Sequence, residues 1–206
     1  MAFTGGLNVP SARYRIRQYI PALHKSAICL REFYGDAGKY PPESRWRRLP
    51  WAVKRLAELL PACLESRNYD VVILQREFLS TIPTLESLSG GPRILDVDDS
   101  IHLNRGGWAA RRLAALSDLV ICGNDYLADV YSQWNSQVAV LPTGVDTARY
   151  VPLHRAEARE LTVGWIGTSA NHKYLLGIER DLSKALSRID AVLRVVSDRR
   201  PNFRYL

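Results

Sequence analysis

Short runs rich in Val, Ile and Leu alternate along this chain with longer stretches that have helical spacing. Each run is bounded by polar or turn residues, as is typical of buried strands. The predicted strands are Ala27–Leu30, Asp70–Leu74, Arg93–Val97, Asp118–Cys122, Val138–Leu141, Thr162–Ile166 and Val192–Val196. The predicted helices are Tyr14–Leu23, a segment over residues 49–64, Trp108–Leu116, Asn124–Trp134 and Tyr174–Ile189. This alternation predicts an α/β fold in which a parallel, doubly wound sheet carries helices on both faces.

The helix predicted over residues 49–64 has one regular apolar face. Its apolar residues follow one another at steps of four, three, four and four, which places them in one line along a helix. They are Leu49, Val53, Leu56, Leu60 and Leu64. Pro50 is acceptable near a helix start, whereas Pro61 is predicted to kink or split the helix.

A domain boundary is predicted in the turn-rich segment Pro142–Pro152. It separates an N-terminal domain, residues 1–150, from residues 151–206, which hold one strand–helix–strand unit. A unit of that length is marginal on its own. We therefore expect either that it docks on the first domain or that the chain is a piece of a longer protein, and we favour the second.

Positive charge is concentrated in the first third of the chain. The whole sequence has 28 Lys+Arg and 21 Asp+Glu, a net of +7, and residues 1–60 alone have 11 basic and 4 acidic residues. Such a bias indicates an anionic partner, although surface charge that only aids solubility is equally open. Basic and aromatic residues are not interleaved in an RNA-recognition pattern, so we expect no nucleic acid.

The basic helix also carries tryptophans. Arg45, Trp46, Arg47, Arg48, Trp51 and Arg55 could press it onto an anionic membrane surface. The alternative is an amphipathic helix that packs its leucine face on the sheet.

Three cysteines, Cys29, Cys63 and Cys122, are an odd number and lie far apart. A disulfide framework or a zinc site is therefore not expected. The sequence has neither a secretory signal at Met1–Gly6 nor an apolar run of the roughly 18–20 residues that a membrane span needs. We expect a cytoplasmic protein, with peripheral association at the inner face of the membrane as an open alternative.

Ligands of open parallel sheets bind beyond the carboxyl ends of the strands, so candidate sites follow the predicted strands. The first is the pair Gly5 and Gly6, with Arg13, Arg15 and Arg17 behind it. Glycines let backbone N–H groups approach an anion, and the arginines add charge. An ordinary glycine turn and a solvated helix face explain the same residues.

The second candidate site is the acidic strand end that contains Asp96, Asp98 and Asp99, with His102 close behind. Crowded carboxylates need a cation, a proton or hydrogen-bond donors. Metal ligation, acid–base chemistry and binding of sugar hydroxyls all fit these carboxylates. A purely structural alternative is that one aspartate caps the next helix and another faces water. The motif also resembles the nucleophile motif of haloacid-dehalogenase-type phosphatases, in which Asp96 would be the nucleophile of a magnesium-dependent phosphohydrolase, although here two predicted strands precede it.

The third candidate site follows the strand Thr162–Ile166. Gly167 allows close backbone approach, Thr168 and Ser169 offer hydroxyl donors, and Lys173 adds a charge within the first helical turn. This chemistry suits a diphosphate, and an ordinary helix N-cap explains much of it.

Taken in order, six segments resemble group 1 (family 4) glycosyltransferases of the GT-B fold. They are Arg13–Leu23, Tyr69–Val72, Ile94–Asp99, Ala115–Asn124, Val140–Asp146 and Val163–Thr168. The resemblance implies two facing Rossmann-like domains, of which residues 1–150 form the acceptor-side domain and residues 151–206 begin the nucleotide-sugar-binding domain. It further implies transfer of a sugar from a nucleotide-sugar donor to a glycan or lipid-linked acceptor.

The resemblance also implies roles for individual residues. Gly5, Gly6, Gly167, Thr168 and Lys173 would lie near the donor phosphates. Asp98 and Asp99 would lie near the reacting sugar. Independently of the resemblance, the charge of Arg13, Arg15 and Arg17 makes them candidates to bind the acceptor or an anion. The resemblance also implies that the transfer step needs no metal ion. No cofactor is expected either, because the nucleotide-sugar is a substrate.

The chain departs from the family in four places, of which the first is a first strand clipped to Met1–Phe3. Thr143 stands where the family often has Asn, Lys173 is at best half of a basic pair, and the family's Glu-x7-Glu segment has no counterpart before Leu206. We therefore expect weak or no donor binding by this chain alone, and a non-catalytic protein that binds a glycan or an anionic surface is the third alternative.

Overall fold

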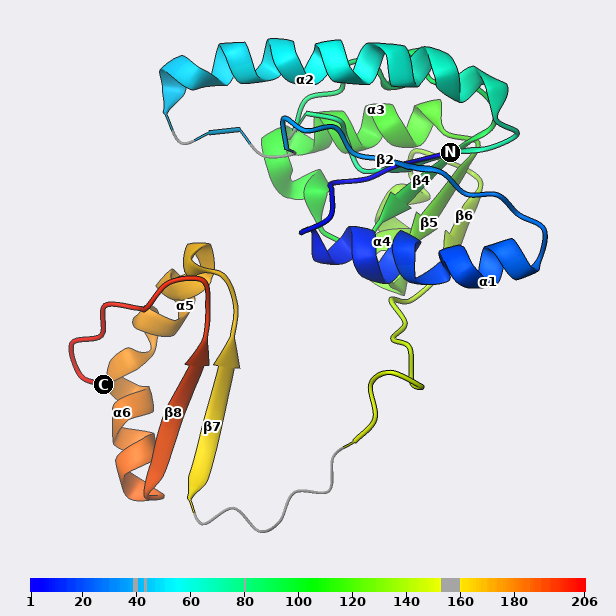
Figure 1. Cartoon of the computed structure of the whole chain (residues 1–206). Helices are drawn as coiled ribbons and strands as arrows, with labels where there is room; N and C mark the ends of the chain where they lie inside the picture. Colours follow the sequence, from blue (N-terminus) through cyan, green and yellow to red (C-terminus); the bar gives the residue numbers. More distant parts are fainter. Residues whose placement is uncertain (39–40, 43, 80, 153–159) are drawn as a thin grey trace. The chain divides into compact units, whose positions relative to one another are not determined.

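The computed structural model describes residues 1–38, 41–42, 44–79, 81–152 and 160–206. These residues form two compact units, Met1–Tyr150 and Val151–Leu206 (Figure 1). Each unit is an α/β structure built on parallel strands, and each is described here by itself.

The first unit contains a six-stranded parallel sheet in the order β2-β1-β3-β4-β5-β6. Its strands are β1 (Ala2–Phe3), β2 (Glu32–Phe33), β3 (Val72–Gln75), β4 (Arg93–Val97), β5 (Leu119–Cys122) and β6 (Val138–Val140). The chain leaves β1 toward one edge to form β2, then crosses back to form β3 on the other side of β1. This reversal is the switch point at which open α/β sheets bind ligands.

Helices α2 (Arg45–Glu65), α3 (Trp108–Leu116) and α4 (Asp125–Tyr131) pack on one face of this sheet. Their buried side chains form one core with alternate residues of the strands. The core includes Leu59, Cys63, Leu74, Leu95, Val97, Leu113, Val120, Leu127 and Tyr131. Figure 1 shows α2 and α3 on one side of the strands and α1 (Ile20–Lys25) on the other, so the predicted doubly wound α/β fold is confirmed.

The helix predicted over Tyr14–Leu23 is helical but divided. It consists of a π-helical turn at Ala12–Ile16 (η1), a 3-10 turn at Arg17–Tyr19 (η2) and then α1. The π turn widens the helix where the side chain of Arg15 enters the protein to reach the sheet.

One predicted strand of the first unit is wrong in position. Ala27–Leu30 is not a strand: Ala27 has a positive φ of 60°, and the N–H of Ile28 donates to the carbonyl of Leu23, so these residues end α1. The strand follows at β2, which pairs with β1. Of the kink or split predicted at Pro61, the split is absent, because α2 is continuous from Arg45 to Glu65. Pro61 and Ala57, whose carbonyl loses its usual donor, are both exposed residues, so water can replace that donor.

The second unit pairs β7 (Leu161–Ile166) with β8 (Ala191–Val196). One face of the pair is covered by η6 (Ser169–Asn171), α5 (His172–Gly177) and α6 (Glu179–Arg188), which replace the single helix predicted over Tyr174–Ile189 (Figure 1). Glu179 at the start of α6 accepts the backbone N–H groups of Arg204 and Tyr205, and thereby ties the C-terminal tail to the helix.

Candidate functional site

The carboxyl edge of the six-stranded sheet brings two of the three predicted sites onto one rim. Thr4, Gly5 and Gly6 follow β1, Arg76 follows β3, and Asp98 follows β4. Because β1 and β3 flank the switch point, the glycine pair and Arg76 stand on its two sides. Asp98 and Asp99 lie one strand further along the same rim.

The glycine pair is braced by an ion pair. Gly6 has a φ of 113°, which a residue with a side chain rarely adopts. Arg17 donates from Nε and Nη2 to the two carboxylate oxygens of Glu32, at 2.9 and 2.7 Å, and the hydroxyl of Thr4 donates to the same carboxylate at 2.7 Å. Nη2 of Arg17 also lies 3.4 Å from the carbonyl of Gly6. Arg17 therefore fixes the shape of the loop.

Arg15 is bound inside the protein. Its Nε lies 2.9 Å from both carboxylate oxygens of Asp96, and its Nη2 lies 2.6 Å from Oδ1. Its Nη1 donates to the carbonyl of Leu141 and to the hydroxyl of Thr143, both at 3.0 Å. Both side chains of the pair are buried. Arg15 thus links η1, β4 and the segment after β6, whereas Arg13, two residues earlier in the same π turn, is exposed.

Asp98 has a carboxylate oxygen without a partner. Oδ1 of Asp98 is buried and makes no hydrogen bond with the part of the chain that the structure describes. Burial raises the pKa of this carboxyl, and the negative charges of Asp99 and Asp96 raise it further, against the opposing effect of Arg15 and Arg76. A buried acceptor of this kind is available to a hydroxyl donor from a ligand.

Asp99 is exposed and is held by Arg76. Nη1 of Arg76 lies 3.0 Å from Oδ2 of Asp99, and the Arg76 side chain itself is largely buried. Arg76 has a φ of 69°, a left-handed conformation that costs a residue with a side chain about 1 kcal/mol. Backbone strain of this kind gathers at functional sites.

Further polar groups at this rim lack partners within the described residues. They are Nε of Arg76, Oε1 of Gln75, Oε2 of Glu77, Nδ1 of His102 and the hydroxyl of Tyr131. The charges of Arg76 and Glu77 both act on the hydroxyl of Tyr131. The ring centroids of His102 and Tyr131 lie 6.4 Å apart. These polar groups therefore extend from Asp98 and Arg76 toward the interior of the first unit. Burial raises the pKa of Tyr131 above its ordinary value.

Sequence reasoning found Asp98, Asp99 and the neighbouring His102 but missed Gln75, Arg76 and Glu77. The rule that ligands bind beyond strand ends applies equally to β3. The strand was predicted to end at Leu74, and the three polar residues that follow it were the available signal.

The third predicted site lies in the second unit, after β7. The backbone N–H and the hydroxyl of Ser169 donate to the carboxylate of Asp198, at 2.6 and 2.9 Å, and these bonds lower the pKa of Asp198. Gly167 packs under the indole of Trp165. Thr168 is exposed, and Nζ of Lys173 lies 4.9 Å from the ring centroid of Tyr174.

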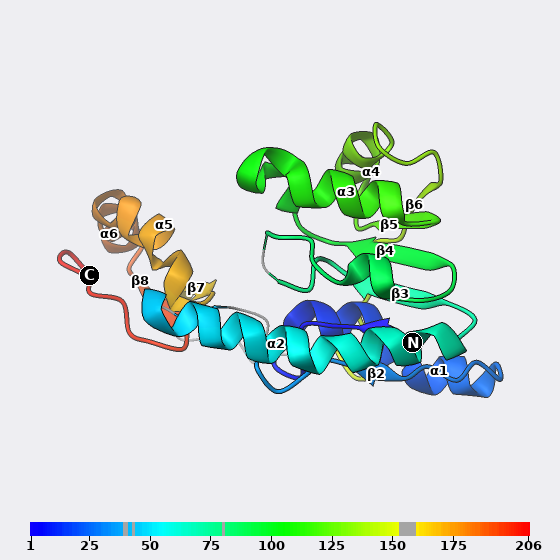
Figure 2. The ribbon, with the colours of Figure 1, turned by 90° about the horizontal axis from the view of Figure 1, so that it is seen from above.

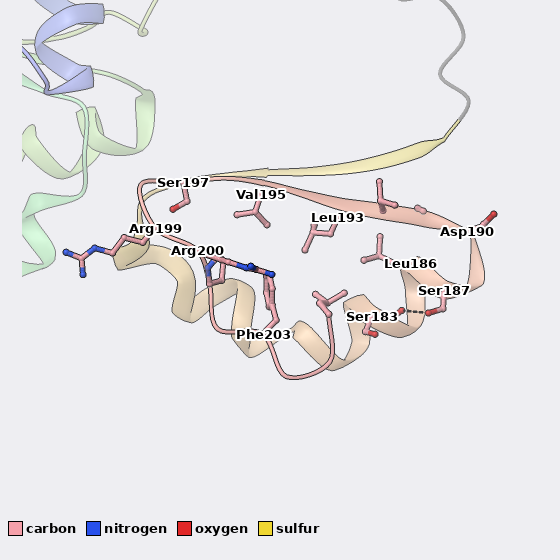
Figure 3. A pocket seen from close by; sticks show the side chains of 14 residues that line it. Ser183, Leu186, Ser187, Asp190, Leu193, Val195, Ser197, Arg199, Arg200 and Phe203 are labelled. Atoms are coloured by element: carbon pink, nitrogen blue, oxygen red, sulfur yellow. Dashed lines mark hydrogen bonds between the residues drawn. The ribbon is translucent and has the colours of Figure 1, made fainter.

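A hollow of about 770 Å³ lies beside β8 in the same unit (Figure 3). Leu186 of α6, Leu193 of β8 and Phe203 of the C-terminal tail contribute its apolar lining, and Arg200 contributes charge. Among the described residues that line it, none belongs to the Gly167–Lys173 segment. The hollow is therefore separate from the loop that the sequence singled out.

The described residues contain no helix long and apolar enough to cross a bilayer. They also contain no cluster of three or more His, Cys, Asp or Glu side chains arranged to hold a metal ion.

The chain matches no model of a known protein family and no curated protein. Among solved structures, it is similar to a chain of the "Glycosylation Associate Protein (Gap123) complex from Streptococcus agalactiae", with 18% sequence identity and a TM-score of 0.38. The match covers 72% of this chain and 30% of that chain, so this chain spans about a third of its length. A TM-score this low carries no argument for the fold or the activity of this chain.

Proposed function

We propose that this chain is part of a glycosyltransferase that moves a sugar from a nucleotide-sugar donor to a glycan or lipid-linked acceptor. The observation that carries the proposal is the pair Asp98 and Asp99 beside Arg76, at the carboxyl end of β4 and next to the switch point. The ordered resemblance of the sequence to group 1 glycosyltransferases supplies the reaction class.

In this proposal Asp98 accepts a hydrogen bond from a sugar hydroxyl through its unpartnered Oδ1. Its raised pKa makes the carboxylate a stronger proton acceptor than an ordinary aspartate. Asp99 binds a second hydroxyl or stabilises positive charge that develops on the reacting sugar. The hydrogen bond with Arg76 orients its carboxylate.

The donor diphosphate is assigned to groups that can offset its charge. In the first unit, backbone N–H groups of Gly5 and Gly6 are suited to approach such an anion. In the second unit, taken by itself, Gly167, Thr168 and Lys173 offer the same kind of groups. Arg13 is the exposed arginine of the predicted anion-binding set. We assign Arg15 and Arg17 positioning roles, because Asp96 and Glu32 hold their guanidinium groups.

The phosphohydrolase alternative is weakened by the position of Asp96. A nucleophilic carboxylate must offer an oxygen lone pair to phosphorus, yet both oxygens of Asp96 accept hydrogen bonds from Arg15 in a buried site. It is checked directly by magnesium-dependent cleavage of p-nitrophenyl phosphate, which the alternative predicts and which Asp96→Asn would abolish.

The proposal is tested by joining the chain to a complete donor-binding domain, because the chain alone is expected to bind a donor weakly or not at all. Release of the nucleoside diphosphate is then measured with a panel of nucleoside-diphosphate sugars. We expect turnover with one donor class and at least a 100-fold loss in Asp99→Ala, whereas Asp129→Ala, an exposed aspartate of α4, keeps full turnover. Absence of turnover with every donor, or unchanged turnover in Asp99→Ala, would contradict the proposal.

A further inference from the structure

Helix α2 has two apolar faces, and only one of them packs on the sheet. Leu59, Ala62 and Cys63 are buried in the core of the first unit. Of the two alternatives open from the sequence, packing of the leucine face on the sheet does not hold, because this face is exposed along most of its length. We define the outer stripe as Trp46, Leu49, Val53, Leu60 and Leu64, all of which are exposed.

The outer stripe is most exposed at the start of the helix, where Trp46 is 92% and Leu49 is 73% accessible. All residues of the first two turns, 44–50, are exposed. Figures 1 and 2 both show this end of α2 projecting beyond the strands of its own unit. An exposed contiguous apolar surface rimmed by charge marks a site of interaction.

The same end of α2 is strongly basic. The segment from Arg45 to Lys54 contains four basic residues and no acidic residue. At 3.6 residues per turn, Arg45 and Lys54 lie on opposite sides of the outer stripe. Tryptophan and leucine on one line, with basic side chains on its flanks, is the composition of a helix that lies in the interface of an anionic bilayer.

We propose that the outer stripe of α2 docks this protein on the surface of an anionic lipid bilayer, with Trp46 and Leu49 inserted among the headgroups. Charge complementarity favours lipid over a second copy of the helix. Glu58 is held by Lys54 and the N–H of Ala37, and Glu65 is held by Arg31. These are the two acidic residues of α2, and both already have partners. The α2 of a second copy would therefore have no free carboxylate to pair with Arg45 or Arg47.

The orientation of α2 relates this surface to the candidate site. Trp51, Arg55 and Glu58 bind the loop of residues 34–37 that follows β2, so this part of the helix lies at the carboxyl end of the sheet. The turns before Trp51 extend past that end, on the side where Asp98 and Asp99 stand. If the proposed function holds, docking brings the site close to the bilayer, and the acceptor is lipid-linked rather than a free glycan.

The test is co-sedimentation of the whole chain with vesicles of phosphatidylcholine alone and of phosphatidylcholine with 30% phosphatidylglycerol. We expect binding to the anionic vesicles and weak binding to the neutral ones. Trp46→Gln/Leu49→Gln removes insertion, and Arg45→Gln/Arg47→Gln should weaken binding about 30-fold, at about five-fold for each basic residue near the surface. All four positions are exposed, so these variants keep the fold, as circular dichroism will verify.

Two control variants remove positive charge or an apolar side chain from exposed positions outside α2. Arg180→Gln/Arg188→Gln loses two exposed charges from α6, and Ile189→Gln loses an exposed apolar side chain. Both controls should bind like the unmodified chain. Equal loss in controls and α2 variants, or absence of binding to anionic vesicles, would overturn the proposal. So would concentration-dependent dimers that Trp46→Gln/Leu49→Gln abolishes, which would indicate a second copy as the partner. Because the vesicle assay needs no sugar donor, its result is independent of the transferase proposal.

Discussion

Arg15 and Asp96 form a buried ion pair that connects three segments far apart in the sequence. The guanidinium of Arg15 reaches from the π turn of η1 to the carboxyl end of β4, with Nη2 2.6 Å from Oδ1 of Asp96. Its remaining N–H groups extend to Leu141 and Thr143. The carboxyl edge of the sheet is therefore shaped by a charge pair as well as by packing.

Removing one partner of this pair should strongly destabilise the first unit. Arg15→Met leaves the Asp96 carboxylate buried without its cation, which costs about 3–5 kcal/mol in the free energy of unfolding. The measurement is urea unfolding followed by circular dichroism. Arg13→Met, at an exposed position on the same segment, should change stability by less than about 0.5 kcal/mol. A similar small change in Arg15→Met would show that the pair contributes nothing to the fold.

Asp98 should make stability depend on pH in the direction opposite to a salt-bridged aspartate. Its pKa is raised in the folded protein above the ordinary 3.8, so the folded state holds the proton more tightly than the unfolded state does. The contribution of protonated Asp98 to the free energy of unfolding is fully present below about pH 3.8, the ordinary pKa of an aspartate. It is lost as the pH rises through the pKa of Asp98 in the folded protein. Asp98→Asn should therefore be more stable than the unmodified chain at pH 7, and the difference should vanish near pH 3.5.

The pH experiment compares urea unfolding of both proteins between pH 3.5 and 8. Asp129→Asn, an exposed aspartate of α4, controls for the loss of one negative charge. If Asp98→Asn is less stable than the unmodified chain at pH 7, then the Asp98 carboxylate has a stabilising partner and is not the free acceptor that the proposed function requires.

The sheet could be predicted from the sequence because buried parallel strands are continuous apolar runs. The strand Arg93–Val97 and the helix Trp108–Leu116 have the predicted boundaries. Glycine, proline or polar residues stand directly before and after each of these apolar segments, and they mark its ends. Ala27–Leu30 was misassigned because a short apolar run that ends a helix has the same composition as a strand. Only the pairing with β1, a contact distant in the sequence, places the strand at Glu32–Phe33.

The orientation of α2 and the fate of each arginine could not be predicted. Periodicity finds an apolar line such as Leu49–Leu64 but does not say whether the line faces the sheet or the solvent. The three arginines Arg13, Arg15 and Arg17 have equivalent local sequence, yet one is exposed and two are paired with acids that lie far away in the chain. The partners depend on tertiary structure, so spacing alone could not separate them.

Gly167 is required by the packing of Trp165. A Cβ at this position would lie 2.8 and 2.9 Å from two carbon atoms of the Trp165 ring. Gly167→Ala should therefore displace the indole and cost about 1–3 kcal/mol. Hydrogen exchange of the β7 and β8 amides measures the effect within the second unit. Gly164→Ala, where a Cβ meets nothing within 4 Å, is the matched control. Equal protection in the two variants would mean that the indole has room to move.

The three thiols should differ sharply in reactivity. Burial raises the pKa of Cys63 to about 12 and that of Cys122 to about 11, so at pH 8 only about 1 in 10,000 and 1 in 1,000 of these thiols are ionised. Cys29 is exposed. Treatment of the folded chain with Ellman's reagent should therefore release about one equivalent quickly, and the other two only after unfolding in urea. Cys29→Ser should abolish the fast phase. Rapid release that persists in Cys29→Ser would show that the core of the first unit, which contains Cys63 and Cys122, opens readily to solvent.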